Sequence, residues 1–145
     1  MKLRGLGKLF SIIFCLKREV LIFTTLQKTT VILGATPDPT RYACKAANML
    51  VKHGHPIVPV GIKKGEVAGK PIQNIQSAIE NVDTITLYIG TKNLPPLFDY
   101  IIGLNPKRII FNPGTENDTL IQLATSKGIE TVVGCTLVML STGNY

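Results

Sequence analysis

The sequence predicts a small doubly wound α/β domain with a mostly parallel sheet of five or six strands. Three observations lead to this fold class. The chain has 145 residues, which is the length of a single domain. Hydrophobic residues make up 45% of the chain and charged residues 17%, which is typical of a chain that buries a core. From Lys28 onward, short β-branched runs alternate with helical patterns, and this alternation indicates βα units around a parallel sheet.

The strands are predicted from short apolar and β-branched runs that end at glycine or at turn residues. These runs are Thr29–Leu33, Ile57–Val60, Pro71–Gln73, Thr84–Ile89, Arg108–Phe111 and Thr131–Val133. Helices are predicted between them from apolar residues at helical spacing and from capping signals. The first helix has Thr40 as its N-cap and ends at Gly54, and the others are Asn74–Glu80, Leu94–Ile102 and Asp118–Ser126.

The basic charge of the chain lies mainly near its N-terminus. Residues 1–28 hold six basic side chains and one acidic side chain, whereas the remainder holds ten basic and eight acidic ones. A nucleic-acid-binding domain would carry its basic stripe on the folded body, so we expect no nucleic-acid partner. No apolar run reaches the roughly 18 residues of a membrane span. Three cysteines without a CxxC pair argue against a disulfide framework or a zinc site and favour a cytoplasmic location.

Residues 1–27 are predicted to form a basic and hydrophobic arm outside the fold, and residues 28–145 to form the domain. The apolar run Leu9–Leu16 resembles part of a signal peptide, but the charged residues 17–19 stand where a cleavage site would follow. Three interpretations stay open. The arm is an extension outside the fold (which a start codon placed too early would also produce), an amphipathic helix on a membrane surface or partner, or a cleaved export signal.

The loop Gly34–Arg41 has the composition of a phosphate-binding turn. Open parallel sheets bind ligands at the carboxyl ends of their strands. This loop joins such an end to a helix N-terminus, where free N–H groups and the helix dipole attract anions. Thr36 and Thr40 add hydroxyl donors, and Arg41 adds a bidentate phosphate ligand. The loop lacks two glycines of the dinucleotide fingerprint, and an ordinary βα turn remains the alternative interpretation.

The end of the second predicted strand bears on the kind of nucleotide. NAD-binding domains place an acidic residue there, which holds the ribose hydroxyls. This chain instead continues from Pro59 and Val60 to Lys63 and Lys64. Lysines favour a phosphorylated ribose, which is either the 2′-phosphate of NADP or the 3′-phosphate of coenzyme A. A solvated loop tip would also explain the two lysines.

An ordered set of segments resembles the CoA-binding protein family. These segments are Val31–Thr36, Val58–Val60, Gly69–Ile72, Thr86–Gly90 and Val132–Cys135. The family consists of single-domain proteins similar to the CoA-binding domain of the succinyl-CoA synthetase alpha subunit. The resemblance implies a Rossmann-like fold that binds coenzyme A or an acyl-CoA. It also implies three groups of contacts: Gly34, Ala35, Thr36 and Arg41 with phosphate, Pro59, Val60 and Lys63 with the adenosine and its 3′-phosphate, and Ile89 and Gly90 along the groove.

No constellation of residues in the sequence predicts a catalytic centre or a metal site. His53 and His55 flank Gly54 at the end of the first predicted helix, which is remote from the carboxyl ends of the strands. We therefore expect a binding, sensor or accessory module for CoA, with a protein partner or a second copy of the chain as a further possibility. Two alternatives stay open: an NADP-dependent oxidoreductase, and a ligand-free structural or interaction domain.

Overall fold

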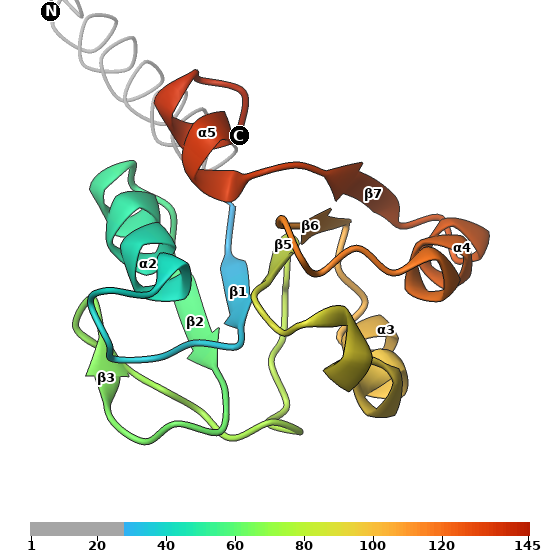
Figure 1. The fold of residues 1–145 in the computed structure, drawn as a ribbon, viewed down its shortest axis with the longest axis horizontal. Helices are drawn as coiled ribbons and strands as arrows, with labels where there is room; N and C mark the ends of the chain where they lie inside the picture. Colours follow the sequence, from blue (N-terminus) through green and yellow to red (C-terminus); the bar gives the residue numbers. More distant parts are fainter. Residues whose placement is uncertain (1–27) are drawn as a thin grey trace, which may run out of the picture.

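The computed structural model describes residues 28–145 and confirms the predicted fold class (Figure 1). Five strands form one parallel sheet in the order β2-β1-β5-β6-β7. Their bounds are β1 Thr30–Leu33, β2 Ile57–Val60, β5 Thr84–Leu87, β6 Arg108–Phe111 and β7 Glu130–Val133. The strand order reverses between β1 and β5, which is where such sheets bind ligands. The predicted arm, residues 1–27, lies outside the described residues.

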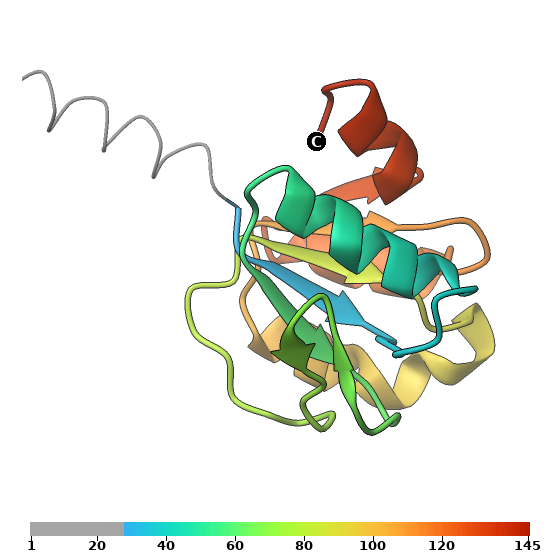
Figure 2. The ribbon, with the colours of Figure 1, turned by 90° about the vertical axis from the view of Figure 1, so that its left-hand side faces the viewer.

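Two pairs of helices cover the two faces of the sheet (Figures 1 and 2). The helices are α2 Tyr42–Lys52 and α5 Thr136–Ser141 on one face, and α3 Phe98–Gly103 and α4 Asp118–Ser126 on the other. Successive side chains of a strand point to opposite faces. Accordingly, Ile32 belongs to the core cluster under α2, whereas Val31 and Leu33 belong to the cluster under α3 and α4. Within residues 28–145 no helix has the length and apolar character needed to cross a membrane.

The predicted helix Asn74–Glu80 is wrong, because this segment has no regular structure. Gln76 has a φ of 83° and nearby Asn81 a φ of 56°, and an α-helix requires negative φ values. Ile75 and Ile79, whose spacing suggested the helix, instead pack against the core cluster under α3 and α4. Burial of two isoleucines therefore shapes this segment more strongly than its helical pattern does.

The predicted strand Pro71–Gln73 is also only partly right. A small antiparallel hairpin pairs β3 Glu66–Val67 with β4 Lys70–Pro71, outside the main sheet. Gln73 forms an isolated parallel bridge with Val60 at the edge of the sheet. The hairpin and this bridge lie alongside β2 and cover that edge (Figure 2).

Helix starts and ends account for the remaining differences. The first part of the predicted helix Leu94–Ile102 is a 3₁₀ turn, Pro95–Leu97, before α3 begins, and another 3₁₀ turn, Thr91–Asn93, precedes the predicted start. Helix α5 is not predicted from the sequence at all. It has only six residues and no side-chain cap, and it is held by packing against α2. A helix this short depends on tertiary contacts because nucleation of an isolated helix is unfavourable.

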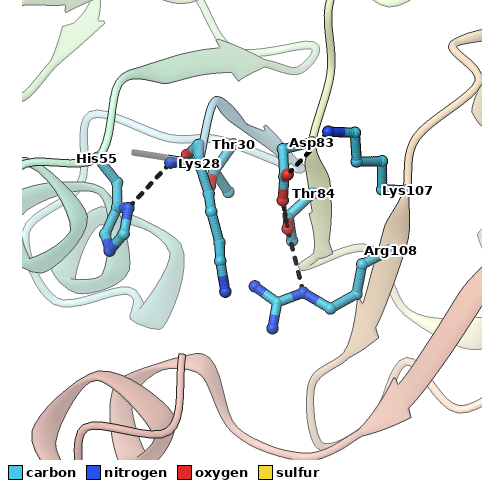
Figure 3. Close-up of polar contacts among 7 residues, drawn as sticks. All are labelled: Lys28, Thr30, His55, Asp83, Thr84, Lys107 and Arg108. Carbon is cyan, nitrogen blue, oxygen red and sulfur yellow. Dashed lines mark hydrogen bonds and ion pairs between the residues drawn. The ribbon is translucent and has the colours of Figure 1, made fainter. Parts of the chain in front are cut away.

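Polar contacts connect neighbouring segments at the amino ends of the strands (Figure 3). The backbone N–H of Lys28 donates to Nδ1 of His55 at 3.2 Å, and Arg108 Nε donates to Thr84 Oγ1 at 3.1 Å. The ring of Tyr145 lies 4.6 Å from the Arg108 guanidinium carbon, a cation–π distance. His55 therefore lies at the amino ends of the strands, and His53 is the C-cap of α2, which agrees with the predicted position of the two histidines after the first helix.

Candidate functional site

A groove with a volume of about 910 Å³ runs along the carboxyl ends of four strands. Its walls come from the loops that follow β1, β2, β5 and β6, from the start of α2, and from the chain near the 3₁₀ turns. The lining residues are Gly34–Thr36, Arg41–Ala43, Gly61–Lys63, Ile75, Tyr88–Gly90, Asn93, Leu97 and Pro113–Thr115. This volume lies in the upper range of small-molecule sites.

Two glycines allow the loops to approach one another closely at the centre of the groove. A Cβ atom on Gly61 would lie 2.7 Å from the carbonyl oxygen of Ala35. A Cβ atom on Gly34, which has a φ of 99°, would lie 2.8 Å from the carbonyl group of Tyr88. The N–H groups of Gly34 and Ala35 both donate to the carbonyl of Val60, at 2.9 and 3.0 Å. These two N–H groups are therefore used within the fold and are not free for a ligand.

The start of α2 supplies the anion-attracting groups instead. The N-cap residue is Arg41, and no side chain caps the first turn of the helix. The first N–H groups of an α-helix have no partner within the helix, and the helix dipole places partial positive charge there. Tyr42 and Ala43, which carry two of these N–H groups, line the groove. The arrangement is suited to a phosphate or another anion.

Thr40 has a different place from the predicted one. It is exposed, it does not line the groove, and it is not the N-cap of α2. Its hydroxyl donates to Asp38 Oδ1 at 2.7 Å, and its N–H donates to the same atom at 2.9 Å. These hydrogen bonds lower the pKa of the Asp38 carboxyl. The proline-rich loop thus supplies Thr40 with a local partner before the helix begins.

Arg41 is free to meet a ligand. Its side chain is 74% exposed, and its Nε lies 3.9 Å from Asp38 Oδ2. Exposed ion pairs of this kind contribute little to stability, so the guanidinium can exchange Asp38 for a ligand anion at small cost. Lys63 is also exposed and lies on the groove with Ile62, whose side chain is 83% exposed.

Pro59 and Val60, for which the resemblance implies contacts with the adenosine end of the ligand, do not line the groove. Both are buried within β2. The Val60 carbonyl holds the first loop, as described above, so these two residues support the site from below. The other seven predicted residues line the groove together, and they are Gly34, Ala35, Thr36, Arg41, Lys63, Ile89 and Gly90.

Several lining residues were missed by the sequence analysis. Ile75 was placed on a helix that does not form, and Leu97 was interpreted only as a helical residue. Tyr42 follows Arg41 at the start of a helix, and this position could have indicated that Tyr42 lines the groove. Tyr88 directly follows β5, and burial raises the pKa of its hydroxyl to about 12, which keeps the phenol protonated at neutral pH.

The charged side chains along the groove suit an anionic ligand. Arg41 and Lys63 are its charged lining residues, and no Asp, Glu, His or Cys of the described part of the chain lines it. Cys135 lies at the N-cap of α5, and Glu116 accepts a hydrogen bond from the Gly114 N–H at 2.7 Å. Among residues 28–145 no cluster of three or more His, Cys, Asp or Glu side chains is placed to hold a metal ion.

Comparisons with known proteins agree with this geometry. Residues 28–141 match the model of a family described as "CoA binding domain". The crystal structure of an uncharacterized protein shares 56% sequence identity with this chain, with a TM-score of 0.80 over 82% of this chain and 98% of that one. No curated protein is similar enough to match.

Two more distant structures share the fold. A protein from Thermus thermophilus is 21% identical, with a TM-score of 0.74 over 88% of this chain and 98% of its own. A hypothetical protein from Pyrococcus horikoshii OT3 is 22% identical, with a TM-score of 0.74 over 86% of this chain and 89% of its own.

Proposed function

The chain belongs to the family of CoA-binding domains, and from this premise we propose that its groove binds coenzyme A or an acyl-CoA. The observation that carries the proposal is the combination of an uncapped helix N-terminus with Arg41 and Lys63 on a groove that no carboxylate of residues 28–145 lines. Coenzyme A carries a pyrophosphate and a 3′-phosphate. Cations and free N–H groups at separate places along one groove match such a ligand.

The order of the strands suggests how the ligand lies. The loop after β2 holds Lys63, the loop after β1 leads to Arg41 and α2, and the loops after β5 and β6 form the rest of the groove. In the proposed pose, the adenosine and its 3′-phosphate meet Lys63. The pyrophosphate meets Thr36, Arg41 and the start of α2. The pantetheine arm then passes Ile89 and Gly90 toward Pro113–Thr115.

We propose a non-catalytic role, and the composition of the groove supports it. A catalyst needs a nucleophile with a base, or two titratable groups held in one pocket. Among residues 28–145, the charged groups that line this groove are the cations Arg41 and Lys63, and burial raises the pKa of the lining Tyr88 to about 12. We therefore propose a carrier, sensor or accessory module, which would pass its signal or its ligand to a protein partner.

Calorimetric titration of the full chain with CoA, dephospho-CoA and NADP⁺ tests the proposal. We expect CoA to bind in the micromolar range, dephospho-CoA to bind more weakly, and NADP⁺ to bind more weakly than CoA. Tighter binding of NADP⁺ would favour the oxidoreductase alternative. Absence of binding by all three ligands would refute a CoA site and leave the ligand-free interaction domain as the better interpretation.

A further inference from the structure

Asn112 is a buried polar residue that lies behind one wall of the groove. It follows β6 directly, and only 3% of it is exposed. It does not line the groove, whereas the next three residues, Pro113–Thr115, do. A buried amide must have hydrogen-bond partners, and the identity of these partners shows what the residue holds in place.

The side chain of Asn112 joins three elements of the fold. Its Nδ2 donates to Thr86 Oγ1 at 2.7 Å and to the Leu87 carbonyl at 2.9 Å, both on β5. Its Oδ1 accepts from the backbone N–H of Thr136, the first residue of α5, at 2.8 Å. Both donor hydrogens and one acceptor position of the amide are thus used. The end of β6 is thereby held to β5 on one side and to α5 on the other.

The backbone of Asn112 shapes the wall itself. Its carbonyl accepts from the Thr115 N–H at 2.9 Å and from Thr115 Oγ1 at 2.8 Å, which closes a tight turn. Gly114 within this turn has a φ of 89°. On the outside the turn is held by exposed contacts, such as the bond from the Thr91 N–H to the Gly114 carbonyl at 3.3 Å. The buried contacts of Asn112 therefore set the position of Pro113–Thr115 relative to the loop after β5.

We propose that Asn112 is a positioning residue for the pantetheine half of the ligand. The proposal rests on the proposed function, in which the pantetheine arm passes Pro113–Thr115. Loss of the amide frees the turn from β5 and α5, and the wall then no longer has one fixed position. Affinity for the pantetheine arm falls, whereas the adenosine end, which lies over β1 and β2, keeps its contacts.

Calorimetry with two ligands distinguishes a loss of affinity for the pantetheine arm from a loss of affinity for the whole ligand. Adenosine 3′,5′-bisphosphate contains the adenosine end of CoA but lacks pantetheine. In the full chain, we expect Asn112→Ser to weaken CoA binding by about fivefold or more, the size of one lost hydrogen bond. Binding of adenosine 3′,5′-bisphosphate should change by less than about twofold. Thr86→Val keeps the shape of the side chain but removes one partner of Asn112, together with the hydrogen bond between Thr86 Oγ1 and Thr136 Oγ1 of α5. It should act in the same direction and decides the question if Asn112→Ser does not fold.

Thr84→Val is the matched control. Thr84 is buried on the same strand and the same face as Thr86, but its hydrogen bonds go to Asp83 and Arg108 at the opposite edge. It should lower stability and leave both affinities unchanged. Three results would overturn the inference. The Asn112 and Thr86 variants could lose affinity for both ligands equally, or they could bind CoA as tightly as the wild type does. Thr84→Val could lose affinity for CoA alone.

The wild-type chain distinguishes the two proposals. If it binds CoA no more tightly than adenosine 3′,5′-bisphosphate, the pantetheine arm makes no useful contact, and the inference fails while CoA binding stands. If it binds neither ligand, the proposed function fails, and the role of Asn112 fails with it.

Discussion

Arg41 is the residue on which the phosphate end of the proposed site depends most directly. Its guanidinium is exposed at the start of α2, with its Nε 3.9 Å from the exposed Asp38 carboxylate. We expect Arg41→Ala to weaken CoA binding by about 1.5–3 kcal/mol, the range for a hydrogen bond to a charged group. The melting temperature should stay unchanged, because exposed ion pairs stabilise little.

Calorimetry of this variant needs a charge-matched control. Lys107→Ala also removes one exposed positive charge, at a side chain that is 83% exposed and pairs with Asp83 at the opposite edge of the sheet. It should leave CoA affinity unchanged. Equal weakening by the two substitutions would mean that only the net charge of the protein matters, and unchanged affinity in Arg41→Ala would remove Arg41 from the site.

Lys63 is expected to recognise the 3′-phosphate. It lies on the groove in the loop after β2, whereas the pyrophosphate is proposed to bind at the start of α2. Lys63→Ala should therefore weaken CoA binding more than dephospho-CoA binding, by about tenfold if one charged hydrogen bond is lost. Titration of both ligands into this variant measures the difference, and equal losses would refute the assignment.

Gly61 is required by the close approach of two loops. Its missing side chain leaves room for the Ala35 carbonyl, which would lie 2.7 Å from a Cβ atom. Gly61→Ala should lower the free energy of unfolding by about 1–3 kcal/mol, as overpacking does, and it should weaken CoA binding as the first loop shifts. Gly103→Ala at the end of α3 meets no atom within 4 Å and should not destabilise the protein in the same urea titration.

At the scale of the elements, we expect the contacts at the amino ends of the strands to make stability depend on pH. His55 accepts a hydrogen bond from the Lys28 N–H, so Nδ1 carries no proton. Burial, together with the charge of Lys28, lowers the pKa of His55. The neutral form is therefore favoured in the folded state. Its stabilising effect is present above the ordinary pKa of 6.5 and is lost as the pH falls toward the lowered folded value.

Urea titrations between pH 7.5 and pH 5.5 would measure this loss. His55→Asn keeps an acceptor near the position of Nδ1 but does not titrate, so its stability should depend less on pH than that of the wild type. His53→Asn is the matched control, because His53 is exposed at the end of α2 and its Nδ1 contacts only the Met49 carbonyl. If His53→Asn rather than His55→Asn flattens the pH dependence, the assignment to His55 is wrong.

For the whole molecule, ligand binding and folding are linked. The groove is assembled from four loops and the start of α2, and these segments come together only in the folded chain. A ligand that binds only the folded state at 100 times its Kd stabilises it by about 2.7 kcal/mol. CoA at that concentration should raise the melting temperature by about 5–10 °C. No rise at saturating CoA would contradict a site built in this way.

Much of the fold follows from patterns within short stretches of the chain. The five sheet strands and the helices α2 and α4 were predicted close to their observed places, because each combines apolar periodicity with a clear stop such as Gly34, Gly54 or Gly128. The strand-end rule then located the groove, since parallel strands bring their carboxyl ends to one edge. Seven of the ten predicted binding residues line that groove as a result.

The remaining features depend on contacts between residues far apart in the chain, which no local pattern contains. Ile75 and Ile79 have helical spacing but belong to an irregular segment. In this conformation both side chains pack against the core cluster under α3 and α4. Helix α5 forms because it packs against α2 and because the Asn112 side chain accepts a hydrogen bond from the N–H of Thr136. Asn112 and Thr136 are 24 residues apart in the chain. Pro59 and Val60 are supports rather than lining residues, because the first loop lies directly on the end of β2. Local sequence preferences set which segments can become strands or helices, and burial and long-range hydrogen bonds decide which of their side chains reach the groove.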